Sequence, residues 1–348
     1  MDIKTIVITG ASGYLGSWIT KTALDAGFIV RATVRDPDDS EKVGHLWALP
    51  GQDRLSLHRA DLTAPGSFDE AVSGADAVIH SASPFQRTGI QDPQAELVTP
   101  AVEGTRTVLN AVDDSPSVRR VVLTSSVVAI MGDAAEARKY PRSVVDETRW
   151  NHTSSLHHEP YGFSKTQAER LAWERHAAQK RWDLITINPA FILGPALSER
   201  LDGASVSILR QLGDGSFERG APDLAIGYVD VRDVATAHVR AVQRPEASGR
   251  YILSERVATF ADVAAWVKER FGDGYRVPNG TVPKWFLWLI APSVGLTRRY
   301  VRQNVGIQFS LDNRRSRSEL GIEYRRAPET VCEHFQQLVD RGIIQPRA

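Results

Sequence analysis

Two side chains near the middle of the chain are the best candidates for chemistry. Tyr161 and Lys165 lie four residues apart in a stretch that reads PYGFSK, and side chains with this spacing on a helix share a face. A free tyrosine has a pKa of about 10 and is a poor acid near neutral pH. An ammonium group one turn away favours the phenolate and makes the phenol a better proton donor. No other tyrosine in the chain has a lysine at this spacing.

The pair gains weight from a glycine-rich segment near the N-terminus. Residues 4–9 (KTIVIT) predict a buried parallel strand, residues 10–16 (GASGYLG) a turn, and residues 17–26 a helix that ends at Gly27. Glycines in such a turn let backbone amides approach a pyrophosphate, and the helix dipole attracts the phosphates. An ordinary glycine-containing turn is disfavoured, because strand, glycines and helix occur together. The predicted dinucleotide-binding residues here are Gly10, Ser12, Gly13, Tyr14, Leu15 and Gly16.

The end of the second predicted strand, residues 28–34, indicates which dinucleotide binds. Arg35 takes the position where an NAD site has a carboxylate, and Lys42 lies seven residues on. Two cations suit the 2′-phosphate of NADP, which an arginine can bind bidentately. Asp36 leaves NAD open, since its carboxylate can accept from a ribose hydroxyl, and solvated surface cations are the other interpretation. We predict NADP(H) as the cofactor.

Length, charge and cysteine content narrow the class of protein. The 348 residues include 42 basic and 42 acidic side chains, so no global field favours nucleic acid or an anionic membrane. The single cysteine, Cys332, excludes an intrachain disulfide and a cysteine-based zinc site, and no metal is predicted. The absence of a signal sequence predicts a cytoplasmic protein. A monomer and a homodimer both remain open.

Apolar runs alternate with helical stretches through the first half of the chain. This alternation predicts an α/β fold with a doubly wound parallel sheet and ligands at the carboxyl ends of its strands. Beyond about residue 195 the pattern weakens, which suggests a smaller second lobe, while residues 251–253 resemble a late strand of the sheet. The further strands are expected at 55–62, 75–82, 118–126 and 183–193, and helices at 96–112 and 161–179. We assign 1–190 and about 228–254 to the cofactor domain, and 191–227 and 255–348 to the substrate lobe.

The most apolar stretch is WFLWLIA at 285–291, bounded by Pro283 and Pro292. It is shorter than the roughly 20 residues needed to cross a bilayer, so no membrane span is predicted. We expect it to pack in the core or to cover the substrate cleft rather than to touch a membrane. Arginines 298, 299 and 302, and 314, 315 and 317, are expected on a solvated face, with contact to a phosphorylated substrate as the less favoured interpretation.

Polar and small residues follow several predicted strands at the edge where ligands bind. The fifth strand ends in Thr124-Ser125-Ser126, and a hydroxyl there can hold a substrate carbonyl oxygen against the tyrosine. We choose Ser126 over Ser125, because side chains alternate along a strand and because the family resemblance given below favours the last serine. The other cofactor contacts predicted at strand ends are Asp61, Leu62, Ser81, Ser83, Thr124, Pro189 and Ile192, together with Tyr161 and Lys165.

These residues together predict a carbonyl reduction. NADPH would deliver a hydride to the carbonyl carbon while Tyr161 protonates the oxygen. Lys165 would stabilise the phenolate and bind ribose hydroxyls, and Ser126 would orient the oxygen. Fixed donors that meet the developing alkoxide supply the stabilisation that usually contributes most.

With these residues in view, the chain resembles the extended short-chain dehydrogenase/reductase family. It is most similar to the branch of dihydroflavonol 4-reductases, cinnamoyl-CoA reductases and aldehyde or ketone reductases. The resemblance implies a Rossmann fold with a smaller, mainly helical substrate lobe, a catalytic triad of Ser126, Tyr161 and Lys165, and a 2′-phosphate held by Arg35 and Lys42. It also matches Asn110 to an asparagine associated with the active site, although an ordinary helix asparagine fits equally well. The motifs are TGASGYLGSWI (9–19), VRATVRDP (30–37), HSASPF (80–85), VEGTRTVLNAV (102–112), RRVVLTSS (119–126), YGFSKTQAERLAW (161–173), INPAFILGP (187–195) and YVDVRDVATAH (228–238).

Departures from the family pattern bear on the substrate. Met131 stands where plant dihydroflavonol reductases have an asparagine, and it can pack on an apolar group. The residues around Tyr161 (EPYGFSK) differ from the NWYCYGK pattern of cinnamoyl-CoA reductases, so a CoA ester is disfavoured. An apolar aldehyde or ketone is predicted, in a cleft formed by Phe85, Ser126, Met131, Tyr161, Phe191 and the 285–291 run.

Two alternatives remain. One is another enzyme of the superfamily, a sugar-nucleotide epimerase or dehydratase or a 3β-hydroxysteroid dehydrogenase. Arg35 argues against the NAD-dependent sugar-nucleotide enzymes, whereas a sterol substrate stays open. The other is a non-catalytic NADP-sensing protein, but such proteins usually lose the tyrosine–lysine pair.

Overall fold

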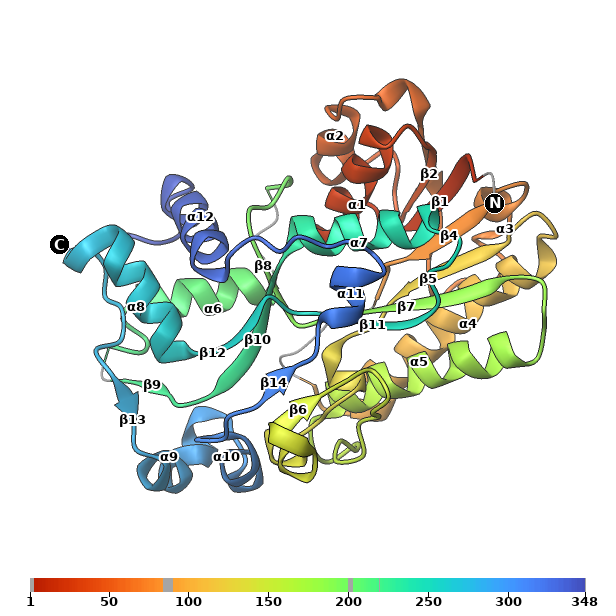
Figure 1. Ribbon diagram of the computed structural model, residues 1–348. Coiled ribbons are helices and arrows are strands. Elements are labelled where there is room, and N and C mark those ends of the chain that lie inside the picture. Colours follow the sequence, from red (N-terminus) through yellow and green to blue (C-terminus); the bar gives the residue numbers. More distant parts are fainter. Residues whose placement is uncertain (1–2, 84–89, 200–202, 219, 348) are drawn as a thin grey trace.

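The computed structural model describes residues 3–83, 90–199, 203–218 and 220–347. Its largest element is a parallel sheet of seven strands in the order β11-β7-β5-β4-β1-β2-β3 (Figure 1). The order reverses beside β1, and in such sheets a dinucleotide binds in the crevice outside the carboxyl ends of the strands at this point. The strands are β1 (Thr5–Thr9), β2 (Ile29–Val34), β3 (Leu55–Arg59), β4 (Ala77–His80), β5 (Arg120–Thr124), β7 (Asp183–Pro189) and β11 (Gly249–Leu253).

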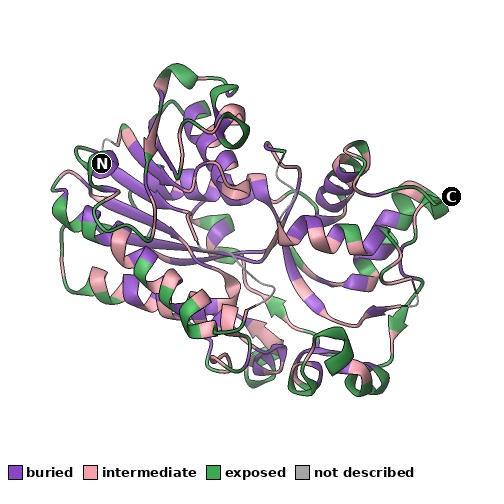
Figure 2. Ribbon diagram, turned by 180° about the vertical axis from the view of Figure 1, so that it is seen from behind, coloured by how far each residue is buried: buried purple, intermediate pink, exposed green. Residues whose placement is uncertain are grey.

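Helices cover both faces of this sheet (Figures 1 and 2). Ile6 and Ile8 of β1 are buried on one face, while Val7 between them is buried in a separate cluster on the other. Burial on both faces explains why the strand lacks the apolar–polar alternation of a half-exposed strand. On the first face lie α1 (Tyr14–Asp25), α2 (Ser40–Trp47) and α7 (Val231–Gln243), and on the second α3 (Asp69–Val72), α4 (Thr99–Asp114) and α5 (Pro160–Ala177).

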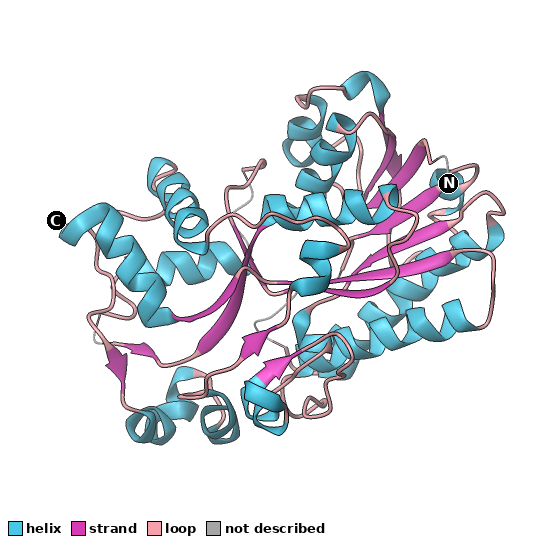
Figure 3. Ribbon diagram, viewed as in Figure 1, coloured by secondary structure: helices cyan, strands magenta, loops and turns pink. Residues whose placement is uncertain are grey.

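A smaller lobe contains a second sheet in the order β12-β10-β8 and several helices (Figure 3). Its core includes Leu209, Val263 and Phe335, one from each of three helices. The lobe is thus mainly helical but includes a sheet that the sequence pattern does not predict. Its elements are β8 (Phe191–Leu193), α6 (Ala204–Gly213), β9 (Ala221–Pro222), β10 (Ala225–Asp230), β12 (Arg256–Thr259), α8 (Phe260–Phe271), β13 (Thr281–Val282), α9 (Lys284–Ile290), α10 (Arg298–Asn304) and α12 (Ala327–Asp340).

The chain passes repeatedly between the two parts. The run predicted as one strand at 183–193 breaks at Ala190, so that β7 belongs to the large sheet and β8 to the small one. The late strand at 251–253 is confirmed as part of β11, which pairs with β7. Later, β14 (Ser310–Leu311) pairs with β6 (Val144–Val145), and α11 (Arg314–Ser318) packs against β11. The proposed boundary near residue 228 falls inside β10.

Short helices complete the described chain. A π-helical turn, η2 (Gln94–Val98), leads into α4. The 3₁₀ segments are η1 (Gln52–Arg54), η3 (Val127–Ala129), η4 (Ala134–Lys139), η5 (Pro141–Ser143), η6 (Gly272–Gly274) and η7 (Ala291–Val294).

The WFLWLIA run forms α9 and the residue after it. Leu287 and Ala291 are buried against α10, but Trp285, Trp288 and Leu289 are exposed. The prediction that this run packs in the core is therefore wrong for most of its side chains. Within the described residues, no helix combines the length and apolarity that a membrane crossing requires.

Candidate active site

The glycine loop between β1 and α1 has the close packing that a dinucleotide turn requires. Gly10 has φ +67°, and a Cβ there would lie 2.8 Å from the Cα of Ala82. A Cβ on Gly16 would lie 2.1 Å from the carbonyl oxygen of Gly10. Neither position has room for a larger residue. Glycine at both positions is what lets the loop pack closely against the end of β4 and the first turn of α1.

The N-terminus of α1 is suited to a diphosphate. Gly13 is the N-cap and offers no side-chain cap, and the first turn contains no acidic residue. The first amides of the helix therefore keep their capacity to bind an anion. Ser12 and Leu15 are half-buried beside them. Tyr14 differs, because its hydroxyl donates to the carbonyl of Gly194 at 2.6 Å, so its predicted contact with the cofactor would have to come from its backbone.

The predicted 2′-phosphate site lies at the ends of β2 and β3. Arg35 is exposed, and its side chain has no ion pair with any described residue. Lys42 is paired with Asp39, with its Nζ 2.5 Å from a carboxylate oxygen. Asp36, the carboxylate that left NAD open, forms an exposed ion pair with Arg59, whose guanidinium lies 2.8 Å from it.

Arg59 is a cation that the sequence analysis missed. It ends β3 and pairs in register with Val34, the residue before Arg35. Its guanidinium also lies 3.0 Å from Asp38. The sequence could have predicted that Arg59 lies near Arg35, because neighbouring parallel strands bring their carboxyl ends together.

A cavity lies at the carboxyl ends of β4 and β5, between α4 and α5. Its walls include the catalytic candidate Lys165 and the predicted cofactor contacts Leu62, Ser83 and Thr124, with His80 and Glu169. Asp61 precedes Leu62, and its Oδ1 accepts from the backbone of Thr63 at 2.8 Å. The hydroxyl of Thr63, which donates to the same oxygen at 2.7 Å, then this backbone hydrogen bond and the nearby Arg35 lower the pKa of Asp61, which favours the ionised carboxylate.

Lys165 and Tyr161 come together on α5 as the spacing predicts. The ammonium of Lys165 lies 5.9 Å from the centre of the Tyr161 ring and donates to the hydroxyl of Ser83 at 3.0 Å. His80 beside it is buried, and burial followed by the charge of Lys165 lowers its pKa to about 3. The histidine is therefore neutral, and Lys165 is the positive charge at this point of the cavity.

The two serines after β5 have different surroundings. Ser125 is buried, and its hydroxyl donates to Glu169. Ser126 is half-buried; its hydroxyl makes only long contacts, 3.4 Å to the carbonyl of Pro189 and 3.3 Å from the amide of Val128. It caps η3, which packs against α5. These surroundings favour Ser126 over Ser125 as the hydroxyl available to a substrate.

A buried network beneath these serines was not predicted. Glu169 is fully buried and pairs with Arg250 at 2.6 Å. Its other oxygen accepts from Asn188 at 2.8 Å, and Asn188 also donates to the carbonyl of Ser126 at 3.1 Å. The sequence could have predicted that Glu169 lies near the site, since it is eight residues after Tyr161 on the same helix face. Arg250 was not, because only the fold brings β11 beside α5.

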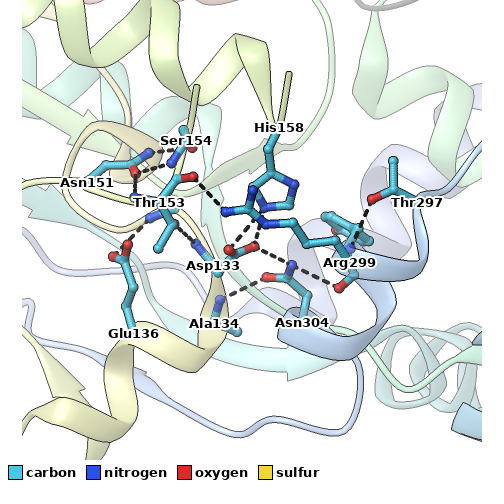
Figure 4. A network of polar contacts seen from close by, with 12 residues as sticks. Asp133, Ala134, Glu136, Asn151, Thr153, Ser154, His158, Thr297, Arg299 and Asn304 are labelled. Atoms are coloured by element: carbon cyan, nitrogen blue, oxygen red, sulfur yellow. Dashed lines mark hydrogen bonds and ion pairs between the residues drawn. The ribbon is translucent and has the colours of Figure 1, made fainter. Parts of the chain in front are cut away.

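A second buried network holds the N-terminal end of α5 (Figure 4). Both carboxylate oxygens of Asp133 lie within 3.0 Å of Nε2 of His158. Asn304 of α10 donates to Asp133 at 2.8 Å and accepts from the amide of Ala134 at 2.8 Å. His158 lies just before Glu159, which has φ +52° ahead of Pro160, a conformation that an ordinary residue adopts only when its surroundings impose it.

The remaining predicted residues have mixed positions. Ser81 donates to the carbonyl of Thr9 at 2.6 Å, and Thr124 bonds to Nε2 of His238 at 2.7 Å. Pro189 is the last residue of β7 in the large sheet, and Ile192 lies in β8 of the smaller sheet.

The predicted substrate residues are likewise divided. Met131 is buried with Ala137, Val145 and Ile252, which leaves it little surface for a ligand. Phe191 is half-buried and packs edge-on against Tyr228. Phe85 lies outside the described residues.

The match of Asn110 to an active-site asparagine is wrong for this structure. Asn110 is exposed on α4, and its carbonyl accepts from Arg175 near the end of α5. The ordinary helix interpretation holds. In the part of the chain that the structure describes, no cluster of three or more histidine, cysteine or acidic side chains could hold a metal.

Comparisons with known proteins identify the family and the fold of the chain. Residues 6–253 match the model of the NAD dependent epimerase/dehydratase family. Cinnamoyl-CoA reductase CAD2 from Medicago truncatula is 42% identical over 345 residues, which cover 97% of this chain and 96% of that protein. A bifunctional dihydroflavonol 4-reductase/flavanone 4-reductase from Malus domestica is 33% identical over 289 residues, 80% of this chain and 79% of that protein. The crystal structure of Gre2 from Candida albicans in complex with NADPH is 26% identical, covers 97% of this chain and 99% of its own, and superimposes with a TM-score of 0.77.

Proposed function

Because the chain belongs to the NAD dependent epimerase/dehydratase family, as an extended short-chain dehydrogenase/reductase, and is an NADP-dependent oxidoreductase, we propose that it reduces an apolar or aromatic aldehyde or ketone to an alcohol. One observation carries the proposal. The ammonium of Lys165 lies beside both the ring of Tyr161 and the hydroxyl of Ser83, in the cavity at the carboxyl ends of β4 and β5. This is the edge at which the fold binds a dinucleotide.

The residues of the chain fit NADPH. The free amides of α1 would hold the diphosphate, and Arg35 with Lys42 would hold the 2′-phosphate. Arg59 pairs with Asp36 and offsets part of the negative charge that would repel this phosphate. The bound cofactor supplies a hydride.

The chain supplies the proton and the stabilising charges. The phenol of Tyr161 donates its proton to the carbonyl oxygen as negative charge develops there. The ammonium of Lys165 stabilises the phenolate that remains, and the hydroxyl of Ser126 donates a second hydrogen bond to the same oxygen. Donors fixed in advance on α5 and after β5 lower the barrier without having to reorganise.

The substrate class is supported by the half-buried Phe191 and by two relatives whose names give a cinnamoyl-CoA and a dihydroflavonol as the compound reduced. A second candidate is a cinnamoyl-CoA thioester, favoured by the 42% identity to a cinnamoyl-CoA reductase. The residues around Tyr161 (EPYGFSK) lack the pattern typical of that enzyme, and we therefore rank it second.

A screen with purified full-length protein tests the proposal. Aldehydes and ketones of increasing apolarity, cinnamoyl-CoA and nucleotide sugars are each offered with NADPH or NADH, and absorbance of the reduced cofactor is followed. We expect turnover of apolar carbonyls with a preference for NADPH. Turnover of nucleotide sugars alone, or a preference for NADH, contradicts the proposal.

A further inference from the structure

Exposed apolar side chains are concentrated at one place on the molecule. Of the seven large hydrophobic side chains exposed among the described residues, five fall between residues 285 and 294. A contiguous exposed apolar surface usually marks an interaction site. These five, which we call the α9 patch, are Trp285 (70% exposed), Phe286 (41%), Trp288 (42%), Leu289 (56%) and Val294 (51%).

The patch is a regular surface on a fixed helix. Trp285, Trp288 and Leu289 have the i, i+3, i+4 spacing that places side chains on one helix face. The opposite side is anchored, because Leu287 and Ala291 are buried with Val301 and Val305. Figure 1 places α9 and α10 at a lower corner of the molecule, and Figure 2 shows α9 largely in the colour of exposed residues. The exposed side chains of the α9 patch therefore lie on a well-packed helix, and their exposure does not result from fraying.

The charged side chains of the segment that carries the patch all have one sign, although Asp223, from outside this segment, lies near Lys284. The chain as a whole carries no net charge, yet residues 274–311 contain five cations and no aspartate or glutamate. The guanidinium of Arg298 lies 4.6 Å from the centre of the Trp288 ring, and Lys284 bonds to the carbonyl of Arg302 at 3.1 Å. Across the described ranges, none of these cations has an ion pair with a carboxylate. The five are Arg276, Lys284, Arg298, Arg299 and Arg302.

We propose that the α9 patch docks the protein onto the surface of an anionic membrane. Tryptophans favour the interface between water and lipid, and an amphipathic helix with basic neighbours inserts its apolar face there. At seven residues α9 cannot span a bilayer, so the contact is peripheral. A second copy of the chain is a poorer occupant, because a symmetric contact would bring like charges together. The proposal does not depend on the substrate or on the reductase activity.

Flotation of the full-length protein with vesicles tests the proposal without cofactor or substrate. Vesicles of phosphatidylcholine alone are compared with vesicles that also contain phosphatidylglycerol. We expect the wild type to float only with the anionic vesicles and to be released by added salt. W285S/W288S should lose flotation. R298Q/R302Q should weaken partitioning about thirtyfold, since each cation near an anionic surface contributes about a factor of five.

Two matched controls separate the patch from general effects. W47S removes a tryptophan that is as exposed as Trp288, at 42%, but belongs to α2. K180Q/R210Q makes the same change of charge at two exposed residues outside the patch. Both controls should float like the wild type.

Several results would overturn the proposal. One is that the wild type does not float with anionic vesicles. Another is that W285S/W288S floats like the wild type while circular dichroism shows that it is folded. A change of W285S/W288S from dimer to monomer in sedimentation would assign the patch to a second copy. If W285S/W288S has a raised KM for a carbonyl substrate in the absence of vesicles, the α9 patch covers the substrate site instead.

Discussion

At the scale of single residues, the position of Lys165 depends on what holds Glu169. The two are four residues apart on α5 and would ordinarily pair with each other. Glu169 is instead occupied by Arg250 at 2.6 Å and by Asn188 at 2.8 Å. Lys165 is thereby left to Ser83 and Tyr161. The buried ion pair beneath the site therefore sets the direction in which Lys165, the proposed catalytic cation, points.

Arg35 gives the first prediction, which concerns cofactor choice. We expect R35S to lower kcat/KM for NADPH about ten- to a hundredfold, because hydrogen bonds between charged groups contribute about 1.5–3 kcal/mol. The value for NADH should barely change, since that cofactor lacks the 2′-phosphate. Steady-state kinetics with both cofactors measure this, with R210S as an exposed arginine control. Equal losses with the two cofactors would show that Arg35 does not bind the phosphate.

Local spacing determined how far residues could be assigned from the sequence. Tyr161 with Lys165, and the glycines of the loop, were accessible because each set lies within seven consecutive residues of the sequence. Glu169 with Arg250, and Asp133 with Asn304, were not accessible, because each pair joins segments that only the tertiary fold brings together. The prediction for Asn110 was wrong for a different reason. The family resemblance assigned it an active-site role, but its side chain is exposed to solvent in this fold.

At the scale of elements, the site is held by connections at the N-terminal ends of its two supporting helices, α1 and α5. The start of α1 lies against the glycine loop. The start of α5 is tied through His158 and Asp133 to α10 of the smaller lobe (Figure 4). Changes in either connection should therefore reach the active site without touching it.

The glycine loop gives the second prediction. G16A should weaken NADPH binding more than about tenfold and lower the free energy of unfolding by roughly 1–3 kcal/mol, the usual cost of forced packing, because its Cβ would lie 2.1 Å from a carbonyl oxygen. G44A in α2 is the control, since nothing lies within 4 Å of its added Cβ; it should be neutral or stabilise the helix by up to about 1 kcal/mol. Cofactor fluorescence titration and urea unfolding measure both. Wild-type binding by G16A would refute the loop assignment.

The connection to α10 gives the third prediction. N304A removes a donor to Asp133 and an acceptor for the amide of Ala134. Leaving buried polar groups without partners should cost roughly 1–3 kcal/mol in the free energy of unfolding, with a fall in kcat as the start of α5 loosens. N279A, at an exposed asparagine, should change neither quantity. If N304A unfolds at the wild-type urea concentration, the network does not stabilise the junction.

At the scale of the whole molecule, the family resemblance, the parallel sheet and the NADP-dependent oxidoreductase class are confirmed. The fold class could be predicted because strands and helices alternate over the first half of the chain, and each of them has a local hydrophobic pattern. The smaller lobe was less predictable: its sheet forms from three short strands separated by up to about 60 residues, and no local period marks them. The division into two domains stays a proposal.

Three buried histidines give the fourth prediction, the loss of stability in acid. Burial, chiefly, lowers the pKa of His80 to about 3 and of His238 and His334 to about 4. The unfolded chain, with histidine pKa values near 6.5, binds protons that the folded chain does not, so stability should fall as the pH drops from about 6.5 to about 4. Each histidine contributes up to about 1.4 kcal/mol per pH unit.

Urea unfolding between pH 7 and pH 5 measures this dependence. The raised pKa values of Glu147 and Asp233 act in the opposite direction, so the comparison of variants is decisive. H238Q should reduce the slope by the contribution of one histidine, whatever it does to stability at pH 7. An unchanged slope would mean that His238 is protonated in the folded state.

The central claim is that Tyr161 delivers the proton. Single-turnover reduction of a carbonyl substrate identified by the screen, with enzyme in excess and NADPH bound, measures the chemical step. We predict that Y161F slows this step about 10²- to 10⁴-fold while NADPH binds as tightly as in the wild type, and that Y275F, which removes a hydroxyl from the smaller lobe, reacts at the wild-type rate. Reduction by Y161F at the wild-type rate would contradict the account.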